Sequence, residues 1–416
     1  MTASSFPVRR LAEVANKIQD GTHFSPRLGG GGFKYITSKN IGFGKLRLDS
    51  VDTISFEEHE KIYRRADTRF GDVLLTKDGA NTGNAALNTF NEEISLLSSV
   101  AFIRANPKLS VEPFILQYFL SGDGQRQITD AMSGNAITRL TLTKIKDLLV
   151  PVPGVDEQQR IGAALGDVDS LMSSLERLIA KKRAIKQGMM QELLTGKRRL
   201  PGFAEPWRVI RLGDHVTYVK NVALSRAQLD SSSPLRYLHY GDIHTRSAST
   251  LDASVEHMPR APRLLARNAG LLQVGDLVFA DASEDPDGVG KSVEITGVPD
   301  EGVIPGLHTI AARFDKRVFA DGFKAYLQFM ADFRAQLLAL AAGTKVLATT
   351  RAYISRIELN LPGVAEQTAI SEAVRDAEIE VEALARRLEA TRAIKQGMMQ
   401  ELLTGRTRLQ TREEAA

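Results

Sequence analysis

Residues 183–196 read Arg-Ala-Ile-Lys-Gln-Gly-Met-Met-Gln-Glu-Leu-Leu-Thr-Gly, and residues 392–405 repeat this stretch without a mismatch. The second copy begins 209 residues after the first (392 − 183), which is half of the 416-residue chain to within one residue. The same offset relates residues 153–155 to residues 362–364, which both read Pro-Gly-Val. An identity of this length does not arise by chance. The chain therefore contains two copies of one unit, each a variable segment followed by a repeated one.

The repeated segment is predicted to form one long helix. Asp156, just after Pro153-Gly154, is a candidate N-cap with Gln159 as its capping-box partner. Apolar or small residues then recur at spacings of three and four, at Ile161, Leu165, Val168, Met172, Leu175 and Ile179, and after a charged interruption at Lys182 the pattern resumes at Ile185, Met189 and Leu193. The second copy has the same phase, at Ile370, Val374, Ala377, Val381, Leu384, Leu388, Ile394, Met398 and Leu402. This heptad-like pattern is typical of a coiled-coil seam.

The ends and the charges of these helices are informative too. Gly196 and Gly405 suit C-terminal stops, and about 39 residues at about 1.5 Å each give a helix near 60 Å long. Residues 176–200 carry a net charge of +6, whereas residues 366–382 carry −5. Antiparallel packing places these opposite charges side by side, so it is favoured over parallel packing. The alternative is that each amphipathic helix packs separately on its own domain.

The two variable segments, residues 1–150 and 205–358, differ in sequence but share the order of their turn residues and short apolar runs. Residues 71–75 (Gly-Asp-Val-Leu-Leu) parallel residues 275–279 (Gly-Asp-Leu-Val-Phe), and both predict a turn that leads into a short buried strand. Further parallels are Lys34-Tyr35-Ile36 with Asn40-Ile41 against Arg236-Tyr237-Leu238 with Asp242-Ile243, and the apolar helices Phe114–Leu120 and Phe323–Met330. Each segment is therefore expected to be an α+β domain with a strand-rich core.

The end of each variable segment carries a family resemblance. Leu149-Val-Pro-Val-Pro-Gly leads into Glu157-Gln158, and Leu359-Asn-Leu-Pro-Gly leads into Glu366-Gln367. A Gly-Asp-hydrophobic strand, such a Pro-Gly and Glu-Gln helix start, and a helix ending in Lys-Gln-Gly-Met-Met-Gln-Glu-Leu-Leu-Thr-Gly are together similar to the specificity subunits of type I restriction-modification enzymes. The resemblance covers essentially the whole chain, and its most specific part is the helix with its ending.

The resemblance implies an α+β fold: two α/β target-recognition domains joined by two long antiparallel helices that form a coiled-coil spacer, as a pseudo-twofold repeat. The expected parts are an N-terminal target-recognition domain (1–152), a first spacer helix (153–200), a C-terminal target-recognition domain (201–361), a second spacer helix (362–409) and a tail (410–416). Each domain would read one half of a bipartite double-stranded DNA site, and the helices would fix the gap between the halves.

The resemblance also implies partners. Two methyltransferase subunits would dock on the helices, and two restriction subunits, which are ATP-driven translocating nucleases, would complete the assembly. S-adenosylmethionine, ATP and Mg²⁺ would be used by those partner subunits, with no cofactor bound by this chain. The alternatives are the recognition subunit of a fused methyltransferase-nuclease, as in type IIB or IIG systems, and a coiled-coil scaffold unrelated to DNA.

Composition is compatible with this interpretation. The formal net charge is +4 with a pI of about 9.1, which suits a polyanionic partner without requiring one. The sequence has no apolar stretch long enough to cross a bilayer and no signal-peptide h-region, so a cytoplasmic protein without membrane contact is expected. It has no cysteine, which excludes disulfides, thiol nucleophiles and Cys-ligated zinc.

No motif supports catalysis by the chain itself. Residues 288–292 (Gly-Val-Gly-Lys-Ser) resemble the end of a P-loop, but Asp285 stands where that motif needs glycine. A carboxylate at that position would repel phosphates. The seven histidines lack metal-ligand spacing, and no Asn/Asp-Pro-Pro-aromatic methyltransferase motif is present. We therefore expect a non-catalytic protein with no catalytic residue and no metal site.

Loop residues able to reach base edges or phosphates are candidate DNA contacts. In the first domain they are Thr22, His23, Ser38, Lys39, Asn40, Lys77, Asn81, Thr82, Asn135 and Arg139. In the second they are His239, Tyr240, His244, Asp281, Ser283, Lys291, His308, Thr344 and Lys345. Apolar residues outside the predicted seam, Met190, Leu194, Met399 and Leu403, are candidates for subunit docking or for packing on their own domains.

Overall fold

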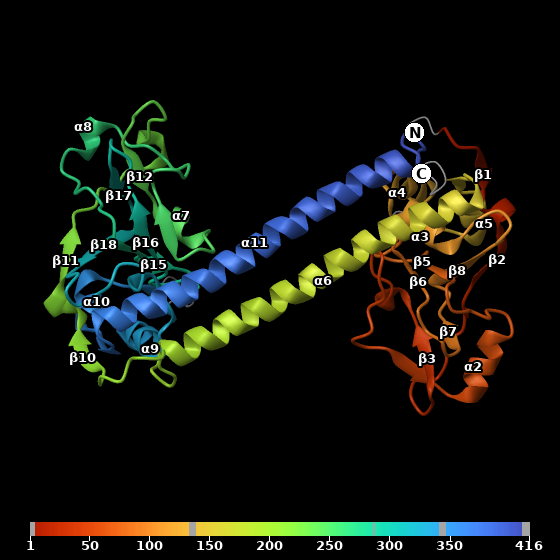
Figure 1. Cartoon of the computed structure of the whole chain (residues 1–416), viewed down its shortest axis with the longest axis horizontal. Coiled ribbons are helices and arrows are strands. Elements are labelled where there is room, and N and C mark those ends of the chain that lie inside the picture. Colours follow the sequence, from red (N-terminus) through yellow and green to blue (C-terminus); the bar gives the residue numbers. More distant parts are fainter. Residues whose placement is uncertain (1–4, 133–138, 286–287, 341–346, 410–416) are drawn as a thin grey trace. The chain divides into compact units, whose positions relative to one another are not determined.

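The computed structural model describes residues 5–132, 139–285, 288–340 and 347–409. The chain divides into two compact units: unit 1 comprises residues 1–178 and 384–416, and unit 2 comprises residues 179–383. Two 39-residue helices, α6 (Val155–Leu193) and α11 (Val364–Leu402), each begin in one unit and end in the other (Figure 1). The expected fold, two α+β domains with two long helices, is confirmed. Among the described residues, no helix combines the length and the apolar character needed to cross a bilayer.

The described residues of unit 1 form three sheets, with strand orders β2-β8-β5-β6, β4-β3-β7 and β1-β9. Its strands are β1 (Val8–Arg10), β2 (Ala15–Asp20), β3 (Phe33–Ile36), β4 (Asp52–Ile54), β5 (Val73–Thr76), β6 (Ala85–Leu87), β7 (Ile94–Leu96), β8 (Val100–Ala105) and β9 (Leu149–Pro151). Its short helices are α1 (Leu11–Val14), η1 (Ser38–Asn40), α2 (Phe56–Tyr63), α3 (Glu112–Leu120), α4 (Gly122–Ala131) and α5 (Leu142–Lys146).

Strand β5 lies at the centre of unit 1 and is buried along its whole length. It pairs antiparallel with β6 and β8. Val73 and Leu75 pack with α3 on one face of the sheet, whereas Leu74 packs with β3 and β7 on the other. Burial on both faces explains why the segment is a continuous apolar run rather than an alternating one.

Unit 2 is built on a five-stranded sheet of order β11-β18-β14-β16-β13, with the small sheets β10-β20, β12-β17 and β15-β19. Its strands are β10 (Arg208–Arg211), β11 (Val216–Val219), β12 (Arg236–Leu238), β13 (Thr250–Asp252), β14 (Leu277–Ala280), β15 (Ala282–Ser283), β16 (Ser292–Gly297), β17 (Val303–Pro305), β18 (Thr309–Phe314), β19 (Leu347–Ala348) and β20 (Glu358–Leu361). Its helices are η2 (Leu212–His215), η3 (Arg226–Gln228), α7 (Tyr240–His244), α8 (Arg263–Ala266), η4 (Lys324–Phe329), α9 (Ala331–Leu340) and α10 (Arg351–Arg356).

The central strand of unit 2, β14, repeats the arrangement of β5. Leu277 and Phe279 pack in one core cluster, and Val278 and Ala280 pack in another on the opposite face. The predicted apolar helix Phe323–Met330 is only partly correct, since this stretch forms the 3₁₀ helix η4 and a regular α-helix follows as α9.

Helices α6 and α11 run antiparallel, as predicted from their charges. In unit 1, Asp169 pairs with Lys395 (2.6 Å) and Glu176 with Arg392 (2.9 Å). In unit 2, Lys182 pairs with Glu380 (2.7 Å) and Lys186 with Glu378 (3.1 Å). In both units the residue number falls on α11 as it rises on α6. Because exposed ion pairs contribute about 0–1 kcal/mol each, they specify the direction of pairing more than they stabilise it.

The two long helices begin and end in the same way. The predicted N-cap is wrong, because α6 begins at Val155 and Asp156 lies in its first turn. The predicted stops are confirmed, since Gly196 and Gly405 adopt φ angles of +67° and +74° after the last helical turn. These left-handed values favour glycine, the residue without a Cβ atom.

The Glu-Gln pair at the start of each helix has a structural role. Gln158 accepts from the backbone N–H of Val111 and donates to the carbonyls of Leu109 and Pro153. Gln367 makes the equivalent three bonds, to Ala320, Val318 and Pro362. Each glutamine therefore ties a helix start to its own domain.

The neighbouring glutamates hold the end of the other helix. Glu157 accepts two bonds from Arg408 (2.5 and 2.6 Å), and Glu366 accepts two from Arg199 at the same distances. Both carboxylates are largely buried. The repeated Glu and Arg positions thus form the same two-bond ion pair in each unit. The need for this pair explains part of the sequence repeat.

The structure corrects one prediction about the helix faces and decides between two alternatives for another. Ile185 and Ile394 were placed in the seam but are 51% and 59% exposed. Met190, Leu194 and Leu403 were candidates for docking but are buried, the first two in the core of unit 2 and the third in that of unit 1. Met399 is half-buried against the unit 1 core. The reason is that the last turns of each helix cover the domain in which they end, so their apolar side chains have a partner within the chain.

Candidate nucleic-acid interface

Four loops meet at one end of the main sheet of unit 1. They are the turn after β3, the segment after β5, the segment before β8 and the segment that leads into α5. The backbone N–H of Lys77 donates to the carbonyl of Ser99 (2.8 Å), and that of Leu140 donates to the carbonyl of Lys77 (2.7 Å). Ser98 N–H donates to the carbonyl of Thr22 (2.8 Å) and brings a fifth segment to the same place.

Unit 2 has the same backbone arrangement. The N–H of Asp281 donates to the carbonyl of His308 (3.1 Å), and that of Thr349 donates to the carbonyl of Asp281 (2.7 Å). We call this feature the loop junction. It comprises residues 37–40, 77–79, 98–99 and 139–140 in unit 1, and residues 239–242, 281–283, 307–308 and 348–349 in unit 2. The two junctions share a backbone frame and differ in their side chains.

The first loop of each junction is built in the same way. The side chain of Asn40 accepts from the N–H of Thr37 (3.0 Å), and that of Asp242 accepts from the N–H of His239 (2.9 Å). A side chain from the next hairpin also holds this loop by donating hydrogen bonds to its carbonyls, and we call that side chain the staple. In unit 1 the staple is Asn84, which donates to the carbonyl of Ile41 (3.3 Å).

In unit 2 the staple is Lys291, whose Nζ donates to the carbonyls of His244 (2.7 Å) and Arg246 (2.6 Å). Burial lowers the pKa of Lys291. The sequence assigned Asn40 and Lys291 to DNA, but the structure uses both side chains to hold the loop. Gly288–Lys291 leads into strand β16 rather than into a helix, which is unlike a P-loop.

The junction of unit 1 presents charged and small polar side chains. Lys39 is exposed, and Arg139 lies at the surface 3.2 Å from the carboxylate of Asp78. Lys77 is buried, with its ammonium 2.8 Å from Asp78 and 3.6 Å from the buried Asp20. Lys77 therefore neutralises acidic groups beneath the surface, and its prediction as a direct DNA contact is wrong.

The other unit 1 candidates lie at or beside the junction. His23 is exposed and pairs with Asp20 (3.2 Å), whereas Thr22 is buried. Asn81 and Thr82 lie in the turn between β5 and β6, where the Thr82 hydroxyl donates to the carbonyl of Gly79 (2.6 Å). The candidates Asn135, Thr344 and Lys345 lie outside the described residues.

The junction of unit 2 presents a cluster of rings around Tyr240. The ring centroids of His239, His308 and His244 lie 4.4, 5.4 and 5.7 Å from that of Tyr240. Burial lowers the pKa of His239, and its Nδ1 accepts from the N–H of Gly241 (3.1 Å). His239 is thus held by the loop itself, whereas His308 is exposed and Tyr240 is half-buried against the core of unit 2.

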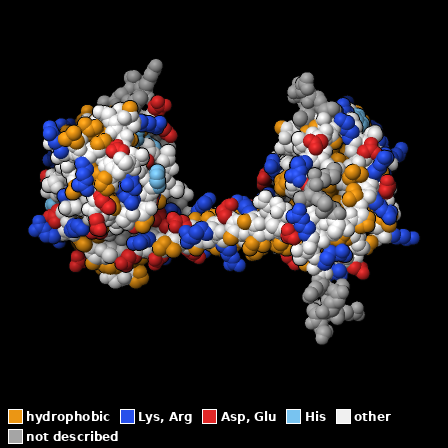
Figure 2. Space-filling model, turned by 90° about the horizontal axis from the view of Figure 1, so that it is seen from above, with side chains coloured by type: hydrophobic (Ala, Val, Ile, Leu, Met, Phe, Trp, Pro, Cys, Tyr) orange, Lys and Arg blue, Asp and Glu red, His pale blue; other side chains and the backbone are white. Residues whose placement is uncertain are grey.

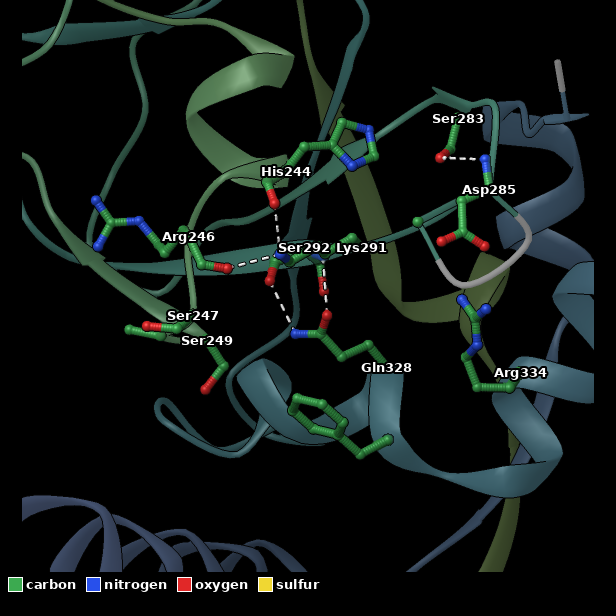
Figure 3. Close-up of a pocket in the computed structure, with 13 residues that line it drawn as sticks. His244, Arg246, Ser247, Ser249, Ser283, Asp285, Lys291, Ser292, Gln328 and Arg334 are labelled. Atoms are coloured by element: carbon green, nitrogen blue, oxygen red, sulfur yellow. Dashed lines mark hydrogen bonds between the residues drawn. The ribbon is translucent and has the colours of Figure 1, made fainter. Parts of the chain in front are cut away.

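A polar cavity of about 600 Å³ lies beside this junction (Figure 3). Its lining includes Arg246, Lys291 and Arg334 from three different segments. Arg246 Nε and the hydroxyls of Ser249 and Ser292 are buried without a hydrogen-bond partner within the described part of the chain. Orphaned polar atoms around a cavity of this size can be satisfied by water or by a polar ligand. Arg246 pairs with Glu256, Lys291 donates to two backbone carbonyls, and Asp285 adds a carboxylate to the lining, so the cavity is mixed in charge.

Several residues of the junctions escaped the sequence analysis. Ser98, Ser99 and Asp78 belong to the unit 1 junction but were not singled out. Ser99 lies 209 residues before His308, so the repeat offset would have found it. Figure 2 shows that Lys and Arg side chains are interspersed with Asp and Glu on the visible face, without one continuous basic patch. Phosphate attraction by this face is therefore moderate.

The two units thus present different side chains on one backbone frame. The comparisons with known proteins indicate the class of protein that the chain resembles. Residues 4–187 match the family described as "Type I restriction modification DNA specificity domain". The chain is thus similar to the specificity subunits of type I restriction-modification systems, which are the non-catalytic DNA-recognition components of those systems.

Individual relatives agree over nearly the full length. The chain is 24% identical to the MjaX specificity subunit of Methanocaldococcus jannaschii, over 97% of this chain and 94% of that protein. Its fold resembles the type I S subunit of M. genitalium, with a TM-score of 0.60, 11% identity and 97% coverage of both chains. A second structure, from work on complex assembly in a type I system, has a TM-score of 0.55 and 17% identity, over 97% of this chain and 99% of that one.

Proposed function

We propose that each loop junction binds one half of a bipartite double-stranded DNA site, and that α6 and α11 set the gap between the halves. The observation that carries this proposal is the shared backbone frame with different side chains. The two units have the same backbone frame but different exposed side chains on it, and this combination suits recognition of two different base sequences. DNA recognition itself is the role of this family.

The chemistry of the junctions supports this role. Lys39 and Arg139 in unit 1 suit guanine edges or phosphates, because their donors match O6 and N7 acceptors. Tyr240 and His308 in unit 2 offer both donors and acceptors, with ring faces for apolar contact.

We further propose that the identical 14-residue segments bind two copies of one partner, the methyltransferase subunit. Upstream in the helices, only eight of 28 aligned positions agree between residues 155–182 and 364–391. In residues 183–196 all positions agree with those of 392–405, including exposed ones. Burial explains identity at core positions but not at exposed ones. A shared partner on both segments explains it.

The exposed identical residues replace the docking candidates that proved to be buried. Among them are Ala184, Ile185, Gln187 and Gln191 in unit 2, and Ala393, Ile394, Gln396 and Gln400 in unit 1. We call these eight residues the repeat face. Two more exposed apolar residues lie near Ile185 and Ile394 along the antiparallel helices, Ile379 in unit 2 and Leu171 in unit 1. Isolated exposed isoleucines are common, but two at the same repeat position support a surface that a shared partner would cover.

Specificity subunits of this family assemble with methyltransferase and restriction subunits. For this chain we propose two of each. S-adenosylmethionine, ATP and Mg²⁺ would then be bound by those subunits and not by this chain. Methyl transfer and cleavage would take place on the partners, directed by the sequence that this chain reads.

The test is methylation mapping in cells with and without the gene, together with purification of the complex. We expect a two-part motif with a constant gap that disappears when the gene is deleted. Replacement of residues 205–358 by the corresponding segment of a relative should change one half of the motif only. A methylation pattern that is independent of this gene, or a chain that purifies without any methyltransferase, would refute the proposal.

A further inference from the structure

We infer that His308 is a specificity-determining residue of unit 2, and that Asp281 orients it. In this arrangement the imidazole Nε2 accepts a hydrogen bond from an exocyclic amino group of a base, on adenine or cytosine, in the half-site that unit 2 binds. The inference rests on the proposed function and deepens it, because it assigns one base contact to one atom.

The backbone at His308 is the first observation. Its φ angle is +56°, and among the described residues it is the one non-glycine residue with a left-handed φ. That conformation is uncommon for a residue with a Cβ atom and persists only where its surroundings hold it. Here the carbonyl of His308 accepts from the N–H of Asp281 (3.1 Å), and strand β18 begins directly after it.

The orientation of the ring is the second observation. Asp281 Oδ1 lies 3.1 Å from His308 Nδ1, so this nitrogen carries the proton and donates. The edge-on contact with Tyr240, at 5.4 Å and 84° between the rings, fixes the ring plane. In a neutral imidazole with Nδ1 protonated, Nε2 is an acceptor. The side chain is 50% exposed, so this acceptor is presented to a ligand.

The equivalent position in unit 1 does not have this property. Ser99 occupies the place of His308, and its hydroxyl accepts from the N–H of Ser38 (3.3 Å) within the junction. The side chain opposite is Lys77 rather than Asp281, and Lys77 is buried. The oriented acceptor is thus specific to unit 2, which is expected if the two units read different bases.

An acceptor that is fixed in place discriminates between bases, because the wrong base leaves it without a hydrogen-bond donor. A base with an amino group at the contacted position satisfies Nε2. A base with a carbonyl there places two acceptors together. Loss of one such contact typically lowers discrimination between bases by about tenfold or more.

The experiment uses the full complex of this chain with its methyltransferase. Methylation of DNA libraries randomised over both half-sites is compared for the wild-type chain, His308→Asn, His308→Gly and Asp281→Ala. Asparagine tolerates the left-handed backbone but is shorter, and glycine removes the strain together with the ring. His257→Ala is the matched control, because His257 is an exposed histidine of the same unit outside the junction.

We expect both His308 variants to relax one base position in the half-site of unit 2 by about tenfold or more. The other half-site and the gap should stay unchanged. Asp281→Ala should weaken the same position, because the ring loses its anchor, and His257→Ala should preserve the motif. Thermal melting checks that each variant is folded.

Two failures are distinguishable. If the wild-type complex methylates no bipartite motif, the proposed function itself is refuted. If the wild-type motif is clear but His308→Gly and His308→Asn read it unchanged, only the inference about His308 is refuted. A change in the half-site of unit 1 would also refute it.

Discussion

The repeat face makes a quantitative prediction about assembly. Ile185 and Ile394 are each about half exposed. Full burial of an isoleucine side chain contributes about 1.5–3 kcal/mol, so about 1 kcal/mol remains to be gained at each position when a partner covers it. Substitution by alanine should remove most of that gain. The affinity for one methyltransferase copy should then fall about fivefold, since 1.4 kcal/mol corresponds to a factor of ten.

Aspartate at the same positions should have a larger effect, because it would bury an unpaired charge in the interface. Native mass spectrometry of the complex provides the measurement. The wild-type chain should carry two methyltransferase subunits, Ile185→Asp one, Ile394→Asp one, and the double variant none.

The matched control is Val255→Asp, at an exposed apolar residue of unit 2 outside the helices. This control should keep two subunits. If Ile185→Asp and Ile394→Asp both retain two methyltransferase subunits, or if the control loses one as they do, the assignment of the repeat face is refuted.

Three further predictions concern stability and its dependence on pH. Lys324 and Glu294 form a buried ion pair at 3.1 Å in unit 2, so Lys324→Met should destabilise the unit by about 3–5 kcal/mol in thermal unfolding. Lys324→Met with Glu294→Gln should recover most of this loss, because glutamine removes the unpaired charge and still offers an acceptor to the backbone N–H groups of Gly322 and Ala325. Burial raises the pKa of Glu294, so the folded unit binds this proton more readily than the unfolded chain, and the stability due to this group falls as pH rises through the folded pKa. Melting of Lys324→Met should therefore show a larger loss at pH 8 than at pH 5, and an equal loss at both would contradict this account. Arg408→Ala should cost about 1–3 kcal/mol in unit 1, because it leaves the buried carboxylate of Glu157 without its two bonds, whereas Arg406→Ala, with a 3.8 Å surface pair, should have an effect near zero in the same assay.

The long helices illustrate what could be predicted from local pattern. Their period, their glycine stops and their antiparallel direction all followed from the residues themselves. These properties depend on neighbours within one or two turns, or on the sum of many charges, which the sequence states directly. The helix start was misplaced because Gly154 and Asp156 are both acceptable caps, and only the backbone distinguishes them.

The faces of the helices illustrate where the pattern fails. A heptad of apolar residues shows that a stripe exists but not what covers it. Met190 and Leu194 are covered by their own domain, whereas Ile185 in the same repeat is left exposed. The turn of the helix at which a domain begins to cover it depends on contacts far apart in sequence.

The loop residues show a similar division. Residue type identified several of the segments that meet at the junctions, since Gly, Asp, Asn and Ser mark the strand ends there, but it missed residues 98–99. It did not reveal that Lys77 and Lys291 point inward, because whether a lysine is exposed or serves as a staple depends on which carbonyls and carboxylates the fold brings near it.

The amino-acid sequence alone therefore determined the duplication, the two long helices and the family resemblance, because repeats and helical periods are written in consecutive residues. Only the tertiary structure determined that the two variable segments share one junction frame. The reason is that this frame consists of hydrogen bonds such as those between Asp281 and His308 and between Lys77 and Ser99. These residues lie more than twenty positions apart, and the bonds are made by backbone atoms that the residue types do not specify.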